Sequence, residues 1–179
     1  EAVAFAGATP VFVDVRADTF NMDADSLAAA VKRVAESGAL KPKAVIPVDL
    51  FGLPADYEAI GKVAKDFGLL VLEDAAQGFG GRIGEKKACS FGDAAAVSFF
   101  PAKPLGCYGD GGAVFTDDAG TAAYIESVRC HGMGGDKYDN VRIGRNSRLD
   151  AVQAAILSVK LEAFRDYELE RVNLTARRY

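Results

Sequence analysis

The sequence predicts an α/β fold in three layers, α/β/α, in which helices flank a mostly parallel central sheet. Two observations lead to this prediction. Short apolar stretches with the composition of buried strands alternate along the chain with amphipathic stretches of helical period. Gly38 and Gly68 stand where two of the amphipathic stretches end, as glycines commonly do after helices. Right-handed crossovers would bring the strands into one sheet.

The composition is that of an ordinary folded domain. The chain has 179 residues, 50% of them hydrophobic and 26% charged, which is enough to bury a core. With a net charge of −4 and no dominant basic cluster, we expect no nucleic-acid partner. No apolar run approaches the length that spans a membrane. The odd number of widely spaced cysteines, Cys89, Cys107 and Cys130, indicates reduced thiols in the cytoplasm and neither disulfides nor zinc.

The first three elements are a helix end, a strand and a helix. Residues 1–6 read like the last turns of a helix that stops at Gly7, so we expect the sequence to be a piece of a longer protein. The β-branched run 11–15 predicts a strand. Asp23 can cap a helix that ends at Gly38. Its apolar face comprises Leu27, Ala30, Val31, Val34 and Ala35.

A second strand, helix and strand follow. The run 44–51 predicts a strand, which Pro47 places at a sheet edge or at a bulge. Asp56 can cap a helix that ends at Gly68. Its apolar stripe comprises Ile60, Val63, Ala64 and Phe67. The uninterrupted apolar run 69–72 is typical of a strand inside a parallel sheet.

That third strand leads into Glu73-Asp74-Ala75-Ala76-Gln77. Ligands of open α/β sheets bind at the carboxyl ends of strands, so Asp74 is a candidate for chemistry, and the small Ala75 and Ala76 would let a flat ring approach. The alternative is an acid in a solvated turn. The glycine-rich stretch 78–84 looks like a dinucleotide-binding pattern, but polar residues 85–87 follow it where an amphipathic helix should. We therefore expect a polar hairpin or loop there, and a nicotinamide oxidoreductase is a rival that this context disfavours.

Lys103 lies in the stretch Ser-Phe-Phe-Pro-Ala-Lys-Pro-Leu-Gly-Cys-Tyr-Gly-Asp-Gly-Gly, residues 98–112. Pro101 and Pro104 stiffen the backbone around it, and the apolar runs 94–100 and 113–115 predict buried strands on both sides. Lys103 is either a surface lysine or an amine nucleophile that forms a Schiff base. The second role needs partial burial or a cationic neighbour to lower its pKa.

The last third of the chain predicts two helices and a loop. Asp117 or Asp118 can cap a helix that ends near His131, which we interpret as a helix-end residue and not as a catalytic base. The glycine-rich loop 133–147 is either mobile or the place where an anionic ligand is caught. Its basic residues and the one that follows are Lys137, Arg142, Arg145 and Arg148. A long amphipathic helix then runs from about Leu149 toward Tyr179 and needs a packing partner.

A lysine and a carboxylate in this order indicate pyridoxal 5′-phosphate, because this cofactor uses a Schiff-base lysine and an acid at its pyridine nitrogen. Four blocks in one order resemble the DegT-type nucleotide-sugar aminotransferases. The blocks are Glu73 to Gln77, Ser98 to Lys103, Gly109-Asp110-Gly111-Gly112, and Gly144-Arg145-Asn146-Ser147-Arg148-Leu149-Asp150.

The resemblance implies a fold-type I architecture with active sites shared across a homodimer. Residues 1–145 would be a partial cofactor-binding large domain, and residues 146–179 a long helix leading toward a small domain. An upstream Ser/Gly-Thr phosphate loop and that small domain, which the family carries, are not among these residues.

The resemblance also assigns roles to single residues. Lys103 would form the Schiff base, Asp74 would face the pyridine nitrogen, Gln77 the phenolic oxygen and Ser98 the phosphate. Asn146 would reach the phosphate in the neighbouring subunit's site, and Arg148 would contact substrate there.

The implied reaction transfers an amino group from an amino acid, glutamate by preference, to a nucleotide-linked keto sugar. Among relatives, the run 104–112 looks most like enzymes that aminate a 3-keto UDP-N-acetylhexosamine uronate for surface polysaccharide. Two rivals stay open. One is a sugar dehydratase of the same fold, which replaces the lysine with histidine and is disfavoured by Lys103. The other is a non-catalytic fragment that holds no cofactor.

Overall fold

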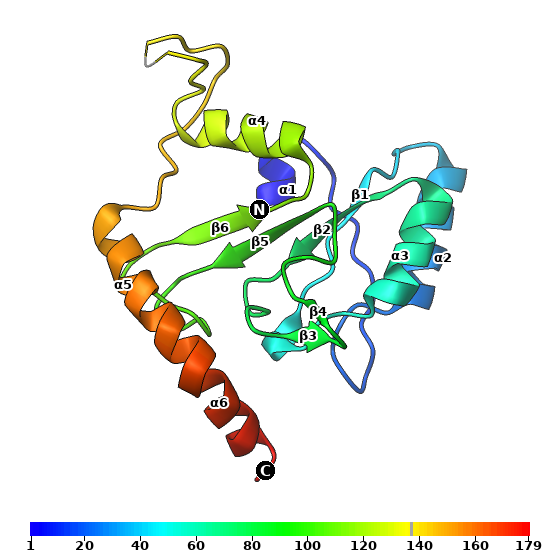
Figure 1. Ribbon diagram of the computed structural model, residues 1–179. Coiled ribbons are helices and arrows are strands. Elements are labelled where there is room, and N and C mark those ends of the chain that lie inside the picture. The colour runs from blue at the N-terminus through cyan, green and yellow to red at the C-terminus, as the bar shows by residue number, and fades with distance from the viewer. Residues whose placement is uncertain (137) are drawn as a thin grey trace.

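The computed structural model describes residues 1–136 and 138–179; Lys137 of the basic loop lies outside the described residues. A four-stranded sheet with the order β1-β2-β5-β6 forms its centre (Figure 1). The first three strands are mutually parallel and the last is antiparallel to its neighbour, which confirms the predicted α/β class with a mostly parallel sheet. The strands are β1 (Ala44–Val45), β2 (Leu70–Asp74), β5 (Ala94–Ser98) and β6 (Gly112–Phe115).

Helices α2 (Ala24–Ser37) and α3 (Tyr57–Phe67) begin and end where the sequence predicts. Asp23 accepts a hydrogen bond from Ser26 N at 2.7 Å, and Asp56 accepts one from Ala59 N at 3.0 Å. Gly38 and Gly68 then adopt positive φ angles of 66° and 64°, which end both helices. The two helices lie side by side (Figure 1) and build one core with β1 and β2. That core comprises Leu27, Val31, Val45, Ala55, Tyr57, Ile60, Ala64 and Leu69.

Two strand predictions are wrong in part or in full. Within 11–15 only Val15 forms an isolated bridge, to Met22, and Phe12 is 91% exposed. A strand forms only where a neighbour pairs with its backbone, and residues 11–13 have no such neighbour in the part of the chain that the structure describes. The predicted strand 44–51 ends at Val45, and residues 50–52 instead form a short 3₁₀ turn, η1 (Leu50–Gly52). The edge position that Pro47 predicts is confirmed, because β1 is an outer strand.

The remaining elements agree with the predicted order. Helix α1 (Ala2–Phe5) stops before Gly7, which has a φ of 73°. Strands β3 (Arg82–Ile83) and β4 (Lys86–Lys87) form the polar hairpin expected after the glycine-rich stretch. Helix α4 (Ala119–Arg129) is capped by Asp118. The last predicted helix is α5 (Ala151–Ala163), capped by Asp150, which continues through a wider turn, η2 (Phe164–Glu168), into α6 (Leu169–Ala176) (Figure 1).

No helix in residues 1–136 and 138–179 combines the length and the apolar character that a membrane span requires.

The two faces of the sheet differ in burial, which decides where a site can form. Val45 and Val97 point to one face, which packs against α2, α3 and α5. Residues of the opposite face are open: Ile46 is 36% exposed, Leu70 is 62% exposed and Val114 is 47% exposed. Asp74 belongs to this second face, at the carboxyl end of β2.

Candidate functional site

Asp74 and Ser98 lie on neighbouring strands at the same edge of the sheet. The parallel register pairs Asp74 with Ala96, so Ser98, two residues further along β5, points to the same face. Asp74 is half-buried, and its Oδ1 accepts a hydrogen bond from Ala76 N at 3.1 Å. Ser98 Oγ accepts one from Phe100 N at 3.2 Å, which leaves the hydroxyl proton free to donate. The fold thus sets a carboxylate beside a hydroxyl donor.

Gln77 follows in the turn after β2, and its amide has a defined orientation. Its Oε1 accepts the N–H of Phe51 at 2.7 Å. Because the oxygen faces Phe51, the Nε2 group is left to donate elsewhere. Phe51 itself has a φ of 57° and is 81% exposed, so a strained turn with an open aromatic ring supports Gln77.

Lys103 is half-buried in the loop between β5 and β6, as expected for a positioned lysine. Its N–H donates to Phe100 O at 2.9 Å, and no other residue among 1–136 and 138–179 hydrogen-bonds or pairs with its Nζ. The buried Cys107 anchors the loop from below, because its N–H and its thiol both donate to Phe99 O, at 2.8 Å and 2.9 Å. An amine held without a partner is available to a ligand.

Helix α5 holds the far side of the same loop, which the sequence analysis missed. Lys160 Nζ donates to Gly106 O and lies over the ring of Tyr108. Gln153 Oε1 accepts the N–H of Tyr108 at 2.8 Å. Gln153 and Lys160 are seven residues apart, two helical turns on one face, and that spacing is the only signal in the sequence.

Gly106 is a sensitive point of the Lys103 loop. A Cβ at this position would lie 2.6 Å from Phe100 O and 2.6 Å from Pro101 O, both backbone atoms that cannot rotate away. We expect Gly106→Ala to lower the free energy of unfolding by about 1–3 kcal/mol in thermal melts. Gly61→Ala in α3 is the matched control, since a Cβ there meets nothing within 4 Å; it should raise stability by up to about 1 kcal/mol. Equal melting temperatures for the two variants would contradict the clash.

Asn146 and Arg148 are exposed residues that hydrogen-bond each other. Arg148 Nε donates to Asn146 Oδ1 at 2.9 Å, both residues are exposed, and Asn146 forms a bridge with Cys130. Neither hydrogen-bonds Asp74, Gln77, Ser98 or Lys103 within the described chain. The chain between α4 and Asn146, where the structure describes it, extends outward beyond α4 (Figure 1). The register of β2 and β5 thus brings Asp74 and Ser98 to one edge, and the turn with Gln77 and the loop with Lys103 continue directly from these two strands.

A pair of buried acids lies behind the site, and it too was missed by sequence analysis. Asp49 and Glu73 are both 0% exposed. Burial, which is the largest cause, and the neighbouring Glu73 carboxyl group together raise the pKa of Asp49 to about 7, against the opposing hydrogen bonds from Tyr57 and Ala55. Burial, followed by the same two carboxyl groups, raises the pKa of the Cys89 thiol to about 12. An acid that directly follows an apolar run, as Asp49 does, was the available signal.

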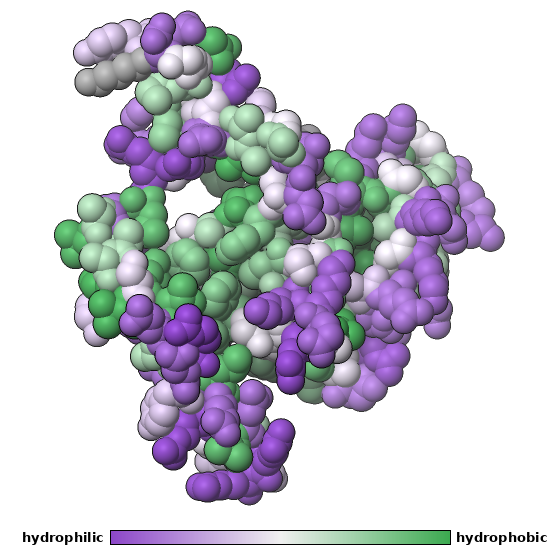
Figure 2. Space-filling view, in the orientation of Figure 1, coloured by the Kyte–Doolittle hydropathy of each residue, from purple (hydrophilic) through white to green (hydrophobic). Residues whose placement is uncertain are grey.

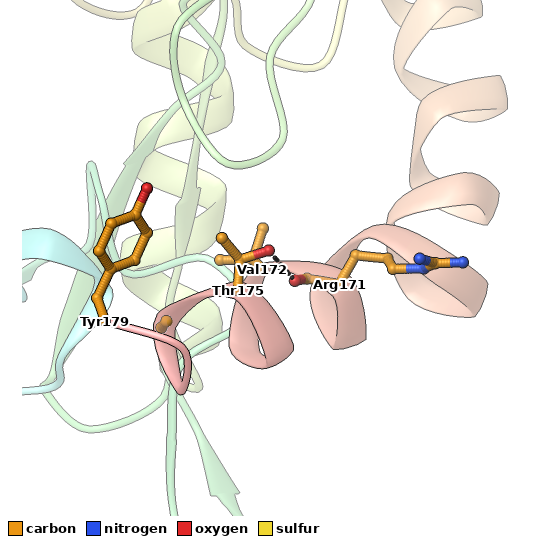
Figure 3. A pocket seen from close by; sticks show the side chains of 5 residues that line it. Arg171, Val172, Thr175 and Tyr179 are labelled. Atoms are coloured by element: carbon orange, nitrogen blue, oxygen red, sulfur yellow. Dashed lines mark hydrogen bonds between the residues drawn. The ribbon is translucent and has the colours of Figure 1, made fainter.

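Two surface hollows of the described chain are lined by other residues than the candidates. A shallow depression on α6 lies beside Arg171, Val172, Thr175 and Tyr179 (Figure 3), all on the last turns of the chain. A larger cleft of about 960 Å³ opens between α4 and the start of α5, over an apolar area of β5 and β6 (Figure 2). The candidate site is instead an open shelf at the carboxyl edge of the sheet.

Comparisons with known proteins find relatives that cover most of this chain. The chain is 47% identical over 166 residues to a UDP-2-acetamido-2-deoxy-3-oxo-D-glucuronate aminotransferase from Pseudomonas aeruginosa, which covers 93% of this chain and 44% of that protein. A DegT DnrJ EryC1 StrS aminotransferase from Brucella abortus superposes with a TM-score of 0.96 at 54% identity, over 99% of this chain and 47% of that one. NtdA from Bacillus subtilis, solved with the bound cofactor PMP, superposes with a TM-score of 0.83 at 31% identity, over 98% of this chain and 38% of that one.

The chain spans about half the length of the relatives it matches. The family description that matches it, "DegT/DnrJ/EryC1/StrS aminotransferase family", covers residues 1–178. Nearly every residue of the chain, the shelf with Asp74, Ser98 and Lys103 included, lies within that match. The chain therefore belongs to the DegT/DnrJ/EryC1/StrS aminotransferase family.

Proposed function

We propose that the protein carrying this chain is a pyridoxal-phosphate-dependent aminotransferase that moves an amino group from an amino acid, glutamate, to a keto group of a nucleotide-linked sugar. The observation that carries the proposal is the juxtaposition of Asp74, Ser98 and the half-buried Lys103 at the carboxyl edge of two parallel strands. Membership of an aminotransferase family supports it.

The residues present fit this cofactor. Ala76 and Ala96 flank the acid with small side chains, and Ala96 is exposed, so a flat ring can lie against this face of the sheet. The donor set comprises an amine, a carboxylate, a hydroxyl and an amide, which match an aldehyde, a pyridine nitrogen, a phosphate and a phenolic oxygen. When bound, pyridoxal phosphate withdraws electrons from the carbon that carries the substrate's amino group.

Each residue of the chain then has a distinct task. The Asp74 carboxylate would hold a proton at the ring nitrogen, Ser98 would donate its hydroxyl proton to the phosphate, and Gln77 Nε2 would donate to the phenolic oxygen. Lys103 Nζ would hold the cofactor at its aldehyde group and, as a free amine, would serve as the base that takes and returns the substrate's proton. Its loop, held by Cys107 and Lys160, keeps the amine within reach.

We further propose that two copies of the protein share their sites. The exposure of Ile143, which lies in the described part of the basic loop and is 98% exposed, supports this. On α5, Val152 is 67% exposed and Val159 is 72% exposed. In such a homodimer Asn146 would reach the phosphate and Arg148 the substrate in the partner's site. Residues 1–145 would form the cofactor-binding part, and residues 146–179 would lead toward a smaller domain. Three free cysteines among the described residues support a cytoplasmic location.

For the substrate we propose a 3-keto UDP-N-acetylhexosamine uronate, because the Pseudomonas aeruginosa relative is named for such a compound. The test incubates the natural protein that carries this chain with pyridoxal phosphate, reduces it with borohydride and maps the labelled peptide. We expect the label on Lys103 and formation of 2-oxoglutarate from glutamate. Absence of cofactor binding would refute the proposed function. Turnover of a neutral 4-keto sugar with none of the uronate would refute the substrate alone.

A further inference from the structure

Asp49 carries a buried carboxyl group in which one oxygen accepts hydrogen bonds and the other has no hydrogen-bond partner among the described residues. Its Oδ1 accepts hydrogen bonds from Tyr57 Oη at 2.8 Å and from Ala55 N at 3.1 Å. Its Oδ2 is buried and has no hydrogen-bond partner among residues 1–136 and 138–179. An ionised oxygen in that position would be strongly disfavoured, whereas a proton on Oδ2 removes the charge.

The neighbouring acid determines where that proton belongs. Both oxygens of Glu73 already accept N–H groups, from Cys89 at 2.5 Å and from Phe91 at 2.8 Å. Both are therefore acceptors, and the proton of the pair belongs on Asp49 Oδ2. The titratable groups that face Asp49 are Glu73 from β2, Tyr57 from α3 and Cys89 from the segment after β4.

Asp49 contacts the backbone behind two cofactor candidates. Its N–H donates to Asp74 O at 3.0 Å. A Cβ on Gly78, the residue after Gln77, would lie 2.5 Å from Asp49 Oδ2, so only glycine lets the carboxyl group pack against this turn. Through Oδ1 the same carboxyl group closes the turn 49–57, and Phe51 of that turn donates its N–H to Gln77 Oε1.

We propose that Asp49 is a positioning residue of the site: its protonated carboxyl group fixes the turn 49–57, and the Phe51 N–H of this turn fixes the amide of Gln77 with Nε2 facing the cofactor. The identity of that cofactor rests on the proposed function, whereas the coupling between Asp49 and the turn does not. Phe51 is held at a positive φ by this arrangement, which a loosened turn would release.

The direction of the pH dependence follows from the burial of Asp49. Its pKa rises from 3.8 to about 7 on folding, so the folded chain binds the proton more tightly than the unfolded chain. The contribution of the Asp49 proton to the stability of the folded state is complete below about pH 4 and is lost as the pH rises through 7. Above pH 7 two negative charges face each other in the interior, and the turn 49–57 loosens.

The first test measures amide hydrogen exchange of Phe51 and Ala55 without cofactor, from pH 5.5 to 8.5, in the natural protein that carries this chain. After correction for intrinsic exchange, we expect protection in the wild type to fall about tenfold across this range. In Asp49→Asn, whose amide stays neutral over this pH range, protection should be constant. Asp93→Asn, at the opposite end of β2, is the control and should follow the wild type. Constant protection in the wild type, or the same fall in Asp49→Asn, overturns the proposal.

The second test uses the loaded protein and reads the pH titration of its visible absorbance band. We expect Asp49→Ala to move the midpoint of this titration by about one pH unit, since a misplaced Gln77 no longer donates to the cofactor. Asp49→Asn, which mimics the protonated carboxyl group, should restore the midpoint that the wild type has with Asp49 protonated. An unchanged midpoint in a folded Asp49→Ala overturns the proposal. If Asp49→Ala does not fold, the exchange data on Asp49→Asn decide. Failure of the wild type to bind cofactor would refute the proposed function and leave the exchange test valid.

Discussion

Lys103→Ala is expected to lower aminotransferase turnover more than about 10³-fold, because the variant loses both the amine that binds the cofactor and the base that moves the proton. The loop itself should persist, since its anchors are the Cys107 thiol and Lys160, and Lys103 contributes only its backbone N–H. Steady-state turnover and the visible absorbance of the loaded protein together measure the two losses.

Two comparisons make this result specific to the Lys103 amine. Lys65→Ala, on the exposed side of α3, should leave turnover and absorbance unchanged. Lys103→Arg keeps the positive charge and cannot form the bond to the aldehyde, so it should be as inactive as the alanine variant. Wild-type activity in Lys103→Ala, or a borohydride label that moves to another lysine with activity retained, would remove Lys103 from the chemistry.

Asp74→Asn is expected to lower turnover by about 10²-fold or more while the protein stays folded. The asparagine can still accept the Ala76 N–H through its Oδ1, so the turn after β2 is preserved. A neutral amide, however, does not hold a proton on the ring nitrogen, and the bound cofactor loses electron-withdrawing power. The measurement is kcat under saturating amino donor and keto sugar, with cofactor content determined in parallel.

The proposed role of Asp74 requires that Asp74→Asn lower the kcat of the loaded protein and not only its cofactor content. Asp66→Asn, an exposed acid on α3, is the control and should match the wild type. If Asp74→Asn keeps normal kcat with full cofactor, Asp74 is the solvated turn acid of the alternative interpretation. A selective loss of cofactor with normal kcat in the remaining loaded fraction would assign Asp74 a binding role only.

Local features of the fold could be predicted from the sequence because they depend on few neighbouring residues. Asp23, Asp56 and Asp118 cap helices through N–H groups three residues away, and Gly38 and Gly68 end helices through a backbone conformation that they adopt easily. Asp74 was placed at a strand end for the same reason, whereas Ser98 became a candidate through the family resemblance. The strand expected at 11–15 failed because a strand depends on a partner that is distant in sequence.

The sequence by itself determined the order of the elements, the caps, the family blocks and the residue types of the site. Only the tertiary structure decided which of them meet. The register of β2 and β5 puts Asp74 and Ser98 on the open face, α5 fastens the Lys103 loop from more than 40 residues away, and Asp49 is packed against Glu73 behind the site. Register, long-range packing and desolvation are properties of pairs that are far apart in the chain, and no local pattern of residues encodes them.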